Sequence, residues 1–140
     1  MHIAFALFAD AANLSQEGKL NILGVFDALQ VASVPAVHPR ANLVVRLKGT
    51  RADVGSHTVT LRWVNPTGKE LWSSTGELNV GTPPIGIMDL DLPLIASLDL
   101  PIDAAGTYTL GIALDHHPTA EVRLMVRTGP PAPPMGSLVS

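Results

Sequence analysis

The sequence predicts an all-β fold: an antiparallel β-sandwich of eight or nine strands, immunoglobulin-like, with Greek-key connections. Short runs carry apolar residues at every second position, and turns rich in Gly and Pro separate these runs. No stretch has the 3.6-residue period of an amphipathic helix. Many short strands at regular spacing are typical of sandwiches and barrels. The motif Asp103-x-x-Gly106-x-Tyr108 then favours the sandwich.

The length of the chain fits one domain. Of its 140 residues, we expect residues 1–128 to form the sandwich and residues 129–140 to form a Pro-rich tail. A domain of this size buries roughly 70% of its unfolded surface, which is enough for a core without cross-links. The chain has no Cys, so disulfides, thiolate metal sites and cysteine nucleophiles are excluded.

The charge composition argues against nucleic-acid binding. The net charge is −3, and the nine Lys and Arg residues are scattered singly along the chain. Only 15% of the residues are charged, whereas soluble domains usually contain about 25%. Two explanations stay open: a β surface rich in Ser and Thr, or apolar surface that is covered when the protein associates with itself.

The apolar opening at residues 3–9 resembles the core of a secretory signal. It lacks a basic leader, however, and Asp10 interrupts it after seven residues. We therefore expect a first β-strand and a cytoplasmic protein. No run is long enough to span a membrane.

A hairpin around residues 16–27 begins the fold, with strands at residues 2–14 and 20–33 and Gly18 in the turn. Both strands are apolar on both faces, as strands are between two layers or beneath a neighbouring subunit. Gly24 indicates a bulge or a close backbone approach. The two predicted faces of the first strand are Ile3, Phe5, Leu7 and Ala9 on one side and Ala4, Ala6 and Phe8 on the other. The two predicted faces of the second strand are Leu20, Ile22, Phe26 and Ala28 on one side and Leu23, Val25, Leu29 and Val31 on the other.

The middle of the chain alternates strands with turns. Pro35 and Pro39 cannot donate to a ladder, so residues 34–39 are predicted as a crossing loop or an edge. The clearest strand has its apolar face at Val59, Leu61 and Trp63. The predicted order is a strand at 43–48, a loop at 49–55, a strand at 57–64, a type I turn at Asn65–Gly68 and a strand at 69–75 with Trp72 in the core.

The last third of the chain continues the pattern. Pro93 is predicted to end one strand, and residues 115–118 to link the final two. The expected elements are a break at 81–84 and strands at 85–92, 96–102, 108–114 and 122–126.

The spacing of Asp103, Gly106 and Tyr108 predicts a tyrosine corner. In immunoglobulin-like sandwiches a Tyr at the start of the penultimate strand packs its ring at the corner, and its hydroxyl bonds an upstream backbone group. The motif concerns architecture and says nothing about activity.

Several of these segments also resemble a family of small bacterial proteins known only as a domain of unknown function. The resemblance covers most of residues 1–127, and its most specific part is the GKLNILGVF hairpin. It implies an all-β domain and a bacterial origin, and it implies no catalytic residues. The matching segments are residues 7–12, residues 18–26, Pro35 and Gly106-x-Tyr108.

Two pairs of polar residues could support chemistry, although no catalytic, cofactor or metal site is predicted. His116 and His117 are adjacent, but a structural zinc needs four ligands and no others are recognisable. Asp89 and Asp91 share one side of a predicted strand. Such a pair can cleave glycosides or bind calcium, but a solvated pair is the simpler interpretation.

The function predicted from these features is a non-enzymatic structural or interaction module without a cofactor. Its expected partner is a second copy of itself or another protein. The alternative is a ligand- or carbohydrate-binding sandwich, which would expose Trp63 or Trp72 on a concave face. The tail has two interpretations, a polyproline II extension or a docking arm anchored by Leu138 and Val139.

Overall fold

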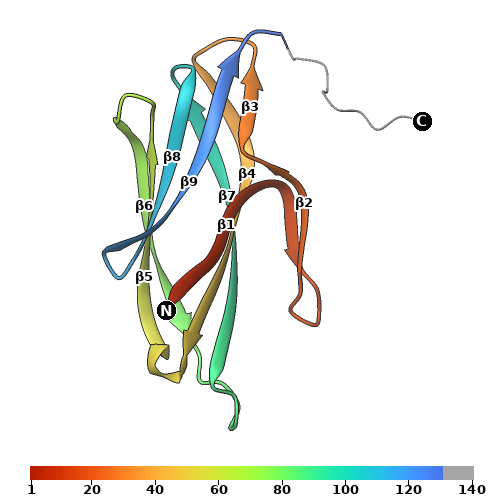
Figure 1. Ribbon diagram of the computed structural model, residues 1–140, viewed down its shortest axis with the longest axis vertical. Coiled ribbons are helices and arrows are strands. Elements are labelled where there is room, and N and C mark those ends of the chain that lie inside the picture. The colour runs from red at the N-terminus through yellow and green to blue at the C-terminus, as the bar shows by residue number, and fades with distance from the viewer. Residues whose placement is uncertain (131–140) are drawn as a thin grey trace, which may run out of the picture.

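The computed structural model describes residues 1–130, which form nine strands in two packed sheets (Figure 1). The four-stranded sheet has the order β2-β1-β4-β7, and the five-stranded sheet has the order β3-β9-β8-β5-β6. The elements are β1 (His2–Leu14), β2 (Leu20–Phe26), β3 (Ala28–Val31), β4 (Ala36–Thr50), a 3₁₀ turn (Arg51–Asp53), β5 (Gly55–Val64), β6 (Glu70–Val80), β7 (Asp89–Ile102), β8 (Gly106–Leu114) and β9 (His117–Thr128).

The predicted β-sandwich is thus confirmed for the described residues. Within them, no helix has the length and apolarity needed to cross a membrane. The predicted tail, including Leu138 and Val139, lies outside the described residues from position 131 onward. Its first residue, Gly129, bonds to β3, since its N–H donates to Val31 O at 3.1 Å.

The core lies between the two sheets and is centred on three aromatic side chains. Trp63 is fully buried, stacks on Tyr108 at 5.0 Å and meets Phe8 edge-on at 6.2 Å. The alternation predicted for the last two strands is confirmed. Their inward side chains are buried at Tyr108, Leu110, Ile112, Leu114, Val122, Leu124 and Val126.

The predicted strand at residues 20–33 is in fact two strands in different sheets. β2 pairs with β1, the chain leaves the sheet at Asp27, and β3 pairs with β9. Asp27 O accepts the N–H of Met125 at 2.9 Å, which fixes the crossing point. The β3–β9 pair is parallel, so the expectation of a purely antiparallel sandwich is wrong at this edge.

A bulge corrects the predicted faces of the first strand. Ile3 pairs with Leu47 on the core side, whereas Phe5 pairs with Arg46 on the outer side. The register shifts at the residue between them, so Ile3 does not share a face with Phe5. Beyond the bulge the core side carries Phe8, and the outer side carries Leu7 and Ala9.

Pro39 lies at an edge, one of the two alternatives predicted for residues 34–39, whereas Pro93 does not end a strand as predicted. Pro39 lies inside β4, at a register shift where β4 pairs only with β7. Pro93 lies inside β7, an edge strand whose outer side needs no donor. Residues 85–88, predicted as strand, form a loop instead. Gly86 has φ +93° there, and Ile87 N–H donates to Pro84 O at 3.2 Å, which closes a turn.

The tyrosine corner is confirmed. The hydroxyl of Tyr108 accepts the N–H groups of Asp103 at 2.9 Å and Ala104 at 3.0 Å. It lies 2.8 Å from Asp103 Oδ1, to which it donates. The ring is fully buried. This corner fixes the start of β8 against the chain that leaves β7.

Candidate functional site

Two highly exposed apolar side chains lie on β2, at one edge of the four-stranded sheet. Leu23 is 70% exposed and Val25 is 60% exposed. β2 pairs only with β1, and the hairpin that these strands form projects beside the two sheets (Figure 1). Exposed apolar side chains on a projecting hairpin are a feature of interaction surfaces.

The exposed side chains of β2 continue into the outer face of the four-stranded sheet. The strand register places Val25 beside Ala9 and Leu23 beside Ala11 on this face. Farther along it, Leu7 lies beside Val44 and Val44 beside Ile95. We call the accessible members of this set the outer apolar face, namely Leu23, Val25, Ala11, Leu7 and Ile95; Ala9 and Val44 between them are fully buried.

The outer apolar face ends at a charged cluster on the same side of the sheet. Arg46 donates to Asp91 through Nε at 2.9 Å and through a second guanidinium nitrogen, and Lys48 Nζ lies 3.4 Å from Asp91. The bonds from Arg46 and Lys48 hold the pKa of Asp91 below its usual range. This cluster is solvated and marks the polar border of the face.

A second group of exposed apolar side chains lies on the β6–β7 loop, at the lower end of the molecule in Figure 1. Ile85 is fully exposed, and Ile87 and Met88 are largely exposed. Arg51 holds the loop, since its guanidinium donates to Pro84 O at 2.6 Å and to Ile87 O at 3.0 Å. The loop is therefore held in one place while its apolar side chains face solvent.

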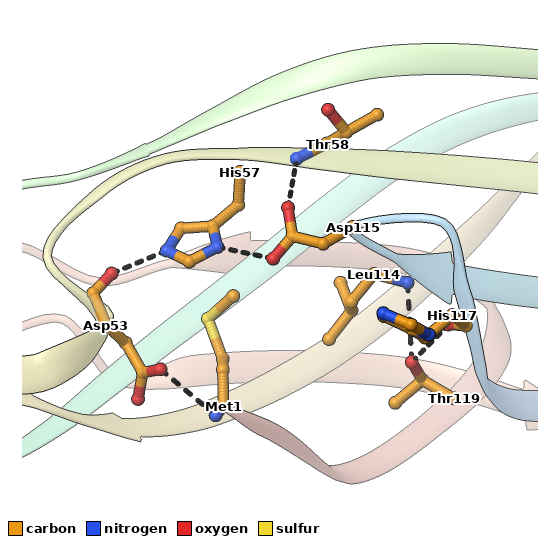
Figure 2. Close-up of polar contacts among 8 residues, drawn as sticks. All are labelled: Met1, Asp53, His57, Thr58, Leu114, Asp115, His117 and Thr119. Atoms are coloured by element: carbon orange, nitrogen blue, oxygen red, sulfur yellow. Dashed lines mark hydrogen bonds and ion pairs between the residues drawn. The ribbon is translucent and has the colours of Figure 1, made fainter.

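A connected polar group lies at the start of β5 (Figure 2). His57 Nδ1 lies 2.7 Å from Asp115 Oδ2, and His57 Nε2 lies 2.6 Å from Asp53 O. Asp115 Oδ1 also accepts the N–H of Thr58 at 2.9 Å. These bonds connect the start of β5 to the preceding turn and to the β8–β9 turn.

The partners of His57 favour its charged form. A carbonyl oxygen and a carboxylate only accept hydrogen bonds, so both ring nitrogens must carry a proton to satisfy both partners. The hydrogen bond to Asp115, followed by that to Asp53 O, raises the pKa of His57. The hydrogen bond between His57 and Asp115, followed by the bond from Thr58 N–H, lowers the pKa of Asp115. Because neither ring nitrogen is free to meet a substrate, the arrangement is a structural clamp.

We predict that stability depends on pH through this clamp. The pKa of His57 is raised in the folded state, so its contribution is complete below its ordinary value of 6.5 and is lost as the pH rises through the folded pKa. The melting temperature of the wild type should therefore fall more between pH 6 and pH 8 than that of His57→Gln. Equal pH slopes for the two proteins would contradict the clamp.

A titration followed by NMR tests the cause of this shift. The imidazole pKa of His57 should lie above 6.5 in the wild type and move back toward 6.5 in Asp115→Asn. His57→Gln identifies its resonance among those of the five His residues. An unchanged pKa in Asp115→Asn would exclude Asp115 as the main cause.

The structure does not bring His116 and His117 into a common site. Asp115 and His116 both have positive φ, 50° and 66°, and form the two-residue turn between β8 and β9. Among residues 1–130, no group of three or more His, Asp or Glu residues is placed to hold a metal ion. The prediction that Asp115 serves a turn is confirmed, and its bond to His57 is an addition.

Asp89 and Asp91 lie on the same outer side of β7, as predicted, but their surroundings differ. Asp91 is bonded to Arg46 and Lys48. Asp89 lines a surface hollow of about 480 Å³ that Asp91 does not line. The other polar side chains of that hollow are His2, Lys48, Thr50 and Asp53. The two carboxylates therefore do not converge on one substrate position.

Neither Trp forms an exposed platform for a sugar. Trp63 is buried, and its Nε1–H donates to Pro101 O at 2.9 Å. Trp72, its partner across β5 and β6, is partly buried against the core. The apolar cavity between the sheets is only about 70 Å³, far below the roughly 300–1,000 Å³ of small-molecule sites. A larger hollow of about 400 Å³, lined in part by His116, has no Trp, Tyr or Phe in its lining.

Sequence reasoning missed the clamp and the exposed edge for the same reason. His57 and Asp115 are 58 positions apart, and the pairing of β5 with β8 brings them together. The exposure of Leu23 and Val25 likewise depends on β2 being an edge strand. The available signal was the apolar residues on both faces of β2, which indicated surface that the protein's own layers do not cover.

Comparison with known proteins identifies a family and gives no activity. No curated protein matches the chain. The model of one protein family matches residues 4–127, which include every strand from β2 to β8 and nearly all of β1 and β9. The chain therefore belongs to a family of unknown function, DUF6941.

Proposed function

We propose that this protein is a non-enzymatic interaction module that self-associates or docks on a larger assembly through the β1–β2 hairpin and the outer apolar face. The exposure of Leu23 and Val25 on β2 carries this proposal. Neither side chain packs against the core, whereas Phe26 on the same strand does.

The composition of the chain supports the same proposal. Only 15% of its residues are charged, and mean hydropathy is +0.30. Contiguous apolar surface on a soluble protein usually marks a binding surface. An immunoglobulin-like classification, which the Tyr108 corner supports, would suit this role, because such sandwiches often serve in recognition at their surfaces.

Light scattering over a concentration series tests the proposal. We expect the wild type to have a mass above the 14.7 kDa of one chain, and the double variant Leu23→Lys/Val25→Lys to return to that mass. Two added charges cannot be buried in an apolar contact without a large cost. The matched control is Ser73→Lys/Thr75→Lys, two exposed positions on the same side of the edge strand β6.

The control variant should keep the mass of the wild type. Two results together would contradict the proposal. The wild type would stay at 14.7 kDa at every concentration, and no partner would bind the wild type and fail to bind the double variant.

The rival function, ligand or carbohydrate binding, has less support. It would need an exposed aromatic in a concave surface, and Trp63 is buried. The hollow lined by His116 offers Arg62 and Glu121 for polar contacts but no Trp, Tyr or Phe for stacking. We therefore prefer the interaction module.

A further inference from the structure

We propose that β2 pairs antiparallel with β2 of a second copy about a two-fold axis at Leu23, joining two four-stranded sheets into one of eight strands. This inference rests on the proposed function and names its partner as the chain itself. Within the described residues, the outer side of β2 makes no backbone hydrogen bond to another strand. An edge strand of this kind is a template for a further strand.

β2 lacks the features that protect the other three edges. Its sequence, LNILGVF, contains neither a charged residue nor Pro. β7 carries Pro93, Pro101 and three Asp residues, which hinder edge pairing. β6 carries Glu70 and Glu77 among Ser and Thr residues. β3 has only four residues. Of the four strands at the ends of the two sheets in residues 1–130, β2 is the one without these protective features.

The charges that flank β2 select an antiparallel pair of copies. Lys19 precedes the strand, and Asp27 follows it. With Leu23 on the axis, Leu20 faces the partner's Phe26, and Lys19 faces the partner's Asp27. The symmetry provides two such ion pairs. A parallel pair of copies would instead place Lys against Lys and Asp against Asp, which is unfavourable.

Both charged side chains are accessible for this contact. Lys19 lies 3.2 Å from Glu17 in its own turn, with both side chains about three quarters exposed, so that ion pair is weak. Asp27 is exposed, and its carboxylate has no hydrogen bond or ion pair within residues 1–130.

The same register also matches the side chains by size. Leu23 meets the partner's Leu23 on the outer side, so two side chains that are 70% exposed cover each other. On the other side, Ile22 lies opposite the partner's Gly24, which has no side chain but is covered by the Asp10 side chain of its own copy. The two outer apolar faces then lie on the same side of one continuous sheet.

Single cysteines test the axis, because the natural chain has none. Directly opposite residues of an antiparallel pair have Cα atoms about 4.5–5.5 Å apart, which a disulfide can span. Leu23→Cys should therefore form a disulfide-linked dimer under mild oxidation. Glu77→Cys, exposed on the β6 edge, is the matched control and should stay monomeric on a non-reducing gel.

Charge reversal tests the register. Lys19→Glu should weaken the dimer roughly tenfold at low salt, because it places Glu against the partner's Asp27 twice. The double variant Lys19→Glu/Asp27→Lys reverses both members of each pair and should restore the affinity of the wild type. If the double variant loses as much affinity as Lys19→Glu alone does, the proposed register is overturned.

The outcomes separate this inference from the proposed function. A wild type heavier than one chain, combined with equal cross-linking of Leu23→Cys and Glu77→Cys, would overturn the β2 pair and leave the interaction module standing. A wild type with a mass of 14.7 kDa, together with no cross-linking of Leu23→Cys, would overturn self-association altogether along with the β2 pair. Selective cross-linking at Leu23 and rescue by the double reversal support it.

Discussion

Trp63→Ala is expected to lower the free energy of unfolding by about 3–5 kcal/mol, as large aromatic truncations in cores do. Trp63 is fully buried and stacks on Tyr108 with ring centroids 5.0 Å apart. It also joins the two sheets, because its Nε1–H on β5 donates to Pro101 O on β7 at 2.9 Å. Removing it leaves a cavity and an unpaired carbonyl. Because small domains are stable by only about 5–15 kcal/mol, the variant loses a large share of its stability.

Urea denaturation followed by circular dichroism measures this loss, since the substitution removes a fluorescent residue. Trp63→Phe is the control that keeps a ring in the core but removes the donor to Pro101. It should cost less than Trp63→Ala, about 1–3 kcal/mol, for a smaller side chain and an unsatisfied acceptor. A loss below about 1 kcal/mol in Trp63→Ala would show that the two sheets are not held together at this point.

The parts of the fold that the sequence predicts well are those fixed by neighbouring residues. The alternation of Tyr108, Leu110 and Ile112 places them on one face of a strand in any sheet. The predicted turn at Asn65–Gly68 follows from its own residues, and Gly68 N–H donates to Asn65 O at 3.0 Å to close it. Such features need no knowledge of which strands are neighbours.

The features that the sequence did not predict depend on strand order. Asp27 looks like any polar residue within an apolar run, yet the chain changes sheets there because β9 offers an open edge. Pro93 is tolerated inside β7 because that strand is an edge. For the same reason Leu23 could be recognised as apolar, but its exposure could not be predicted. The candidate surface thus follows from the topology, and the sequence supplies only its composition.

Gly106→Ala is the second substitution with a large expected effect, a loss of about 2–5 kcal/mol from backbone strain and overpacking together. Gly106 has φ +136°, a conformation that residues with a Cβ rarely adopt. A Cβ at this position would also lie 2.8 Å from two carbons of the Pro66 ring. The ring is rigid, so the whole β5–β6 turn would have to move.

That turn is bonded to the tyrosine corner, which is why its displacement is costly. Asn65, only 8% exposed, donates from Nδ2 to Asp103 Oδ2 at 2.9 Å, and the other oxygen of this carboxylate accepts from Tyr108. Moving Pro66 therefore strains the bonds of both Asn65 and Tyr108 to Asp103. Urea denaturation measures the loss.

Gly55→Ala separates the two causes of this loss, because Gly55 has a similar φ of +128° but open space around its Cβ position. It should cost about 1–3 kcal/mol, the strain alone. In a Pro66→Gly background, Gly106→Ala should cost no more than Gly55→Ala does, because the ring that it would meet is gone. If Gly106→Ala and Gly55→Ala lower the free energy of unfolding equally in the wild-type background, the β5–β6 turn can move away from the added Cβ without a cost in stability. The contact between Pro66 and Gly106 would then not explain why Gly is needed at this corner.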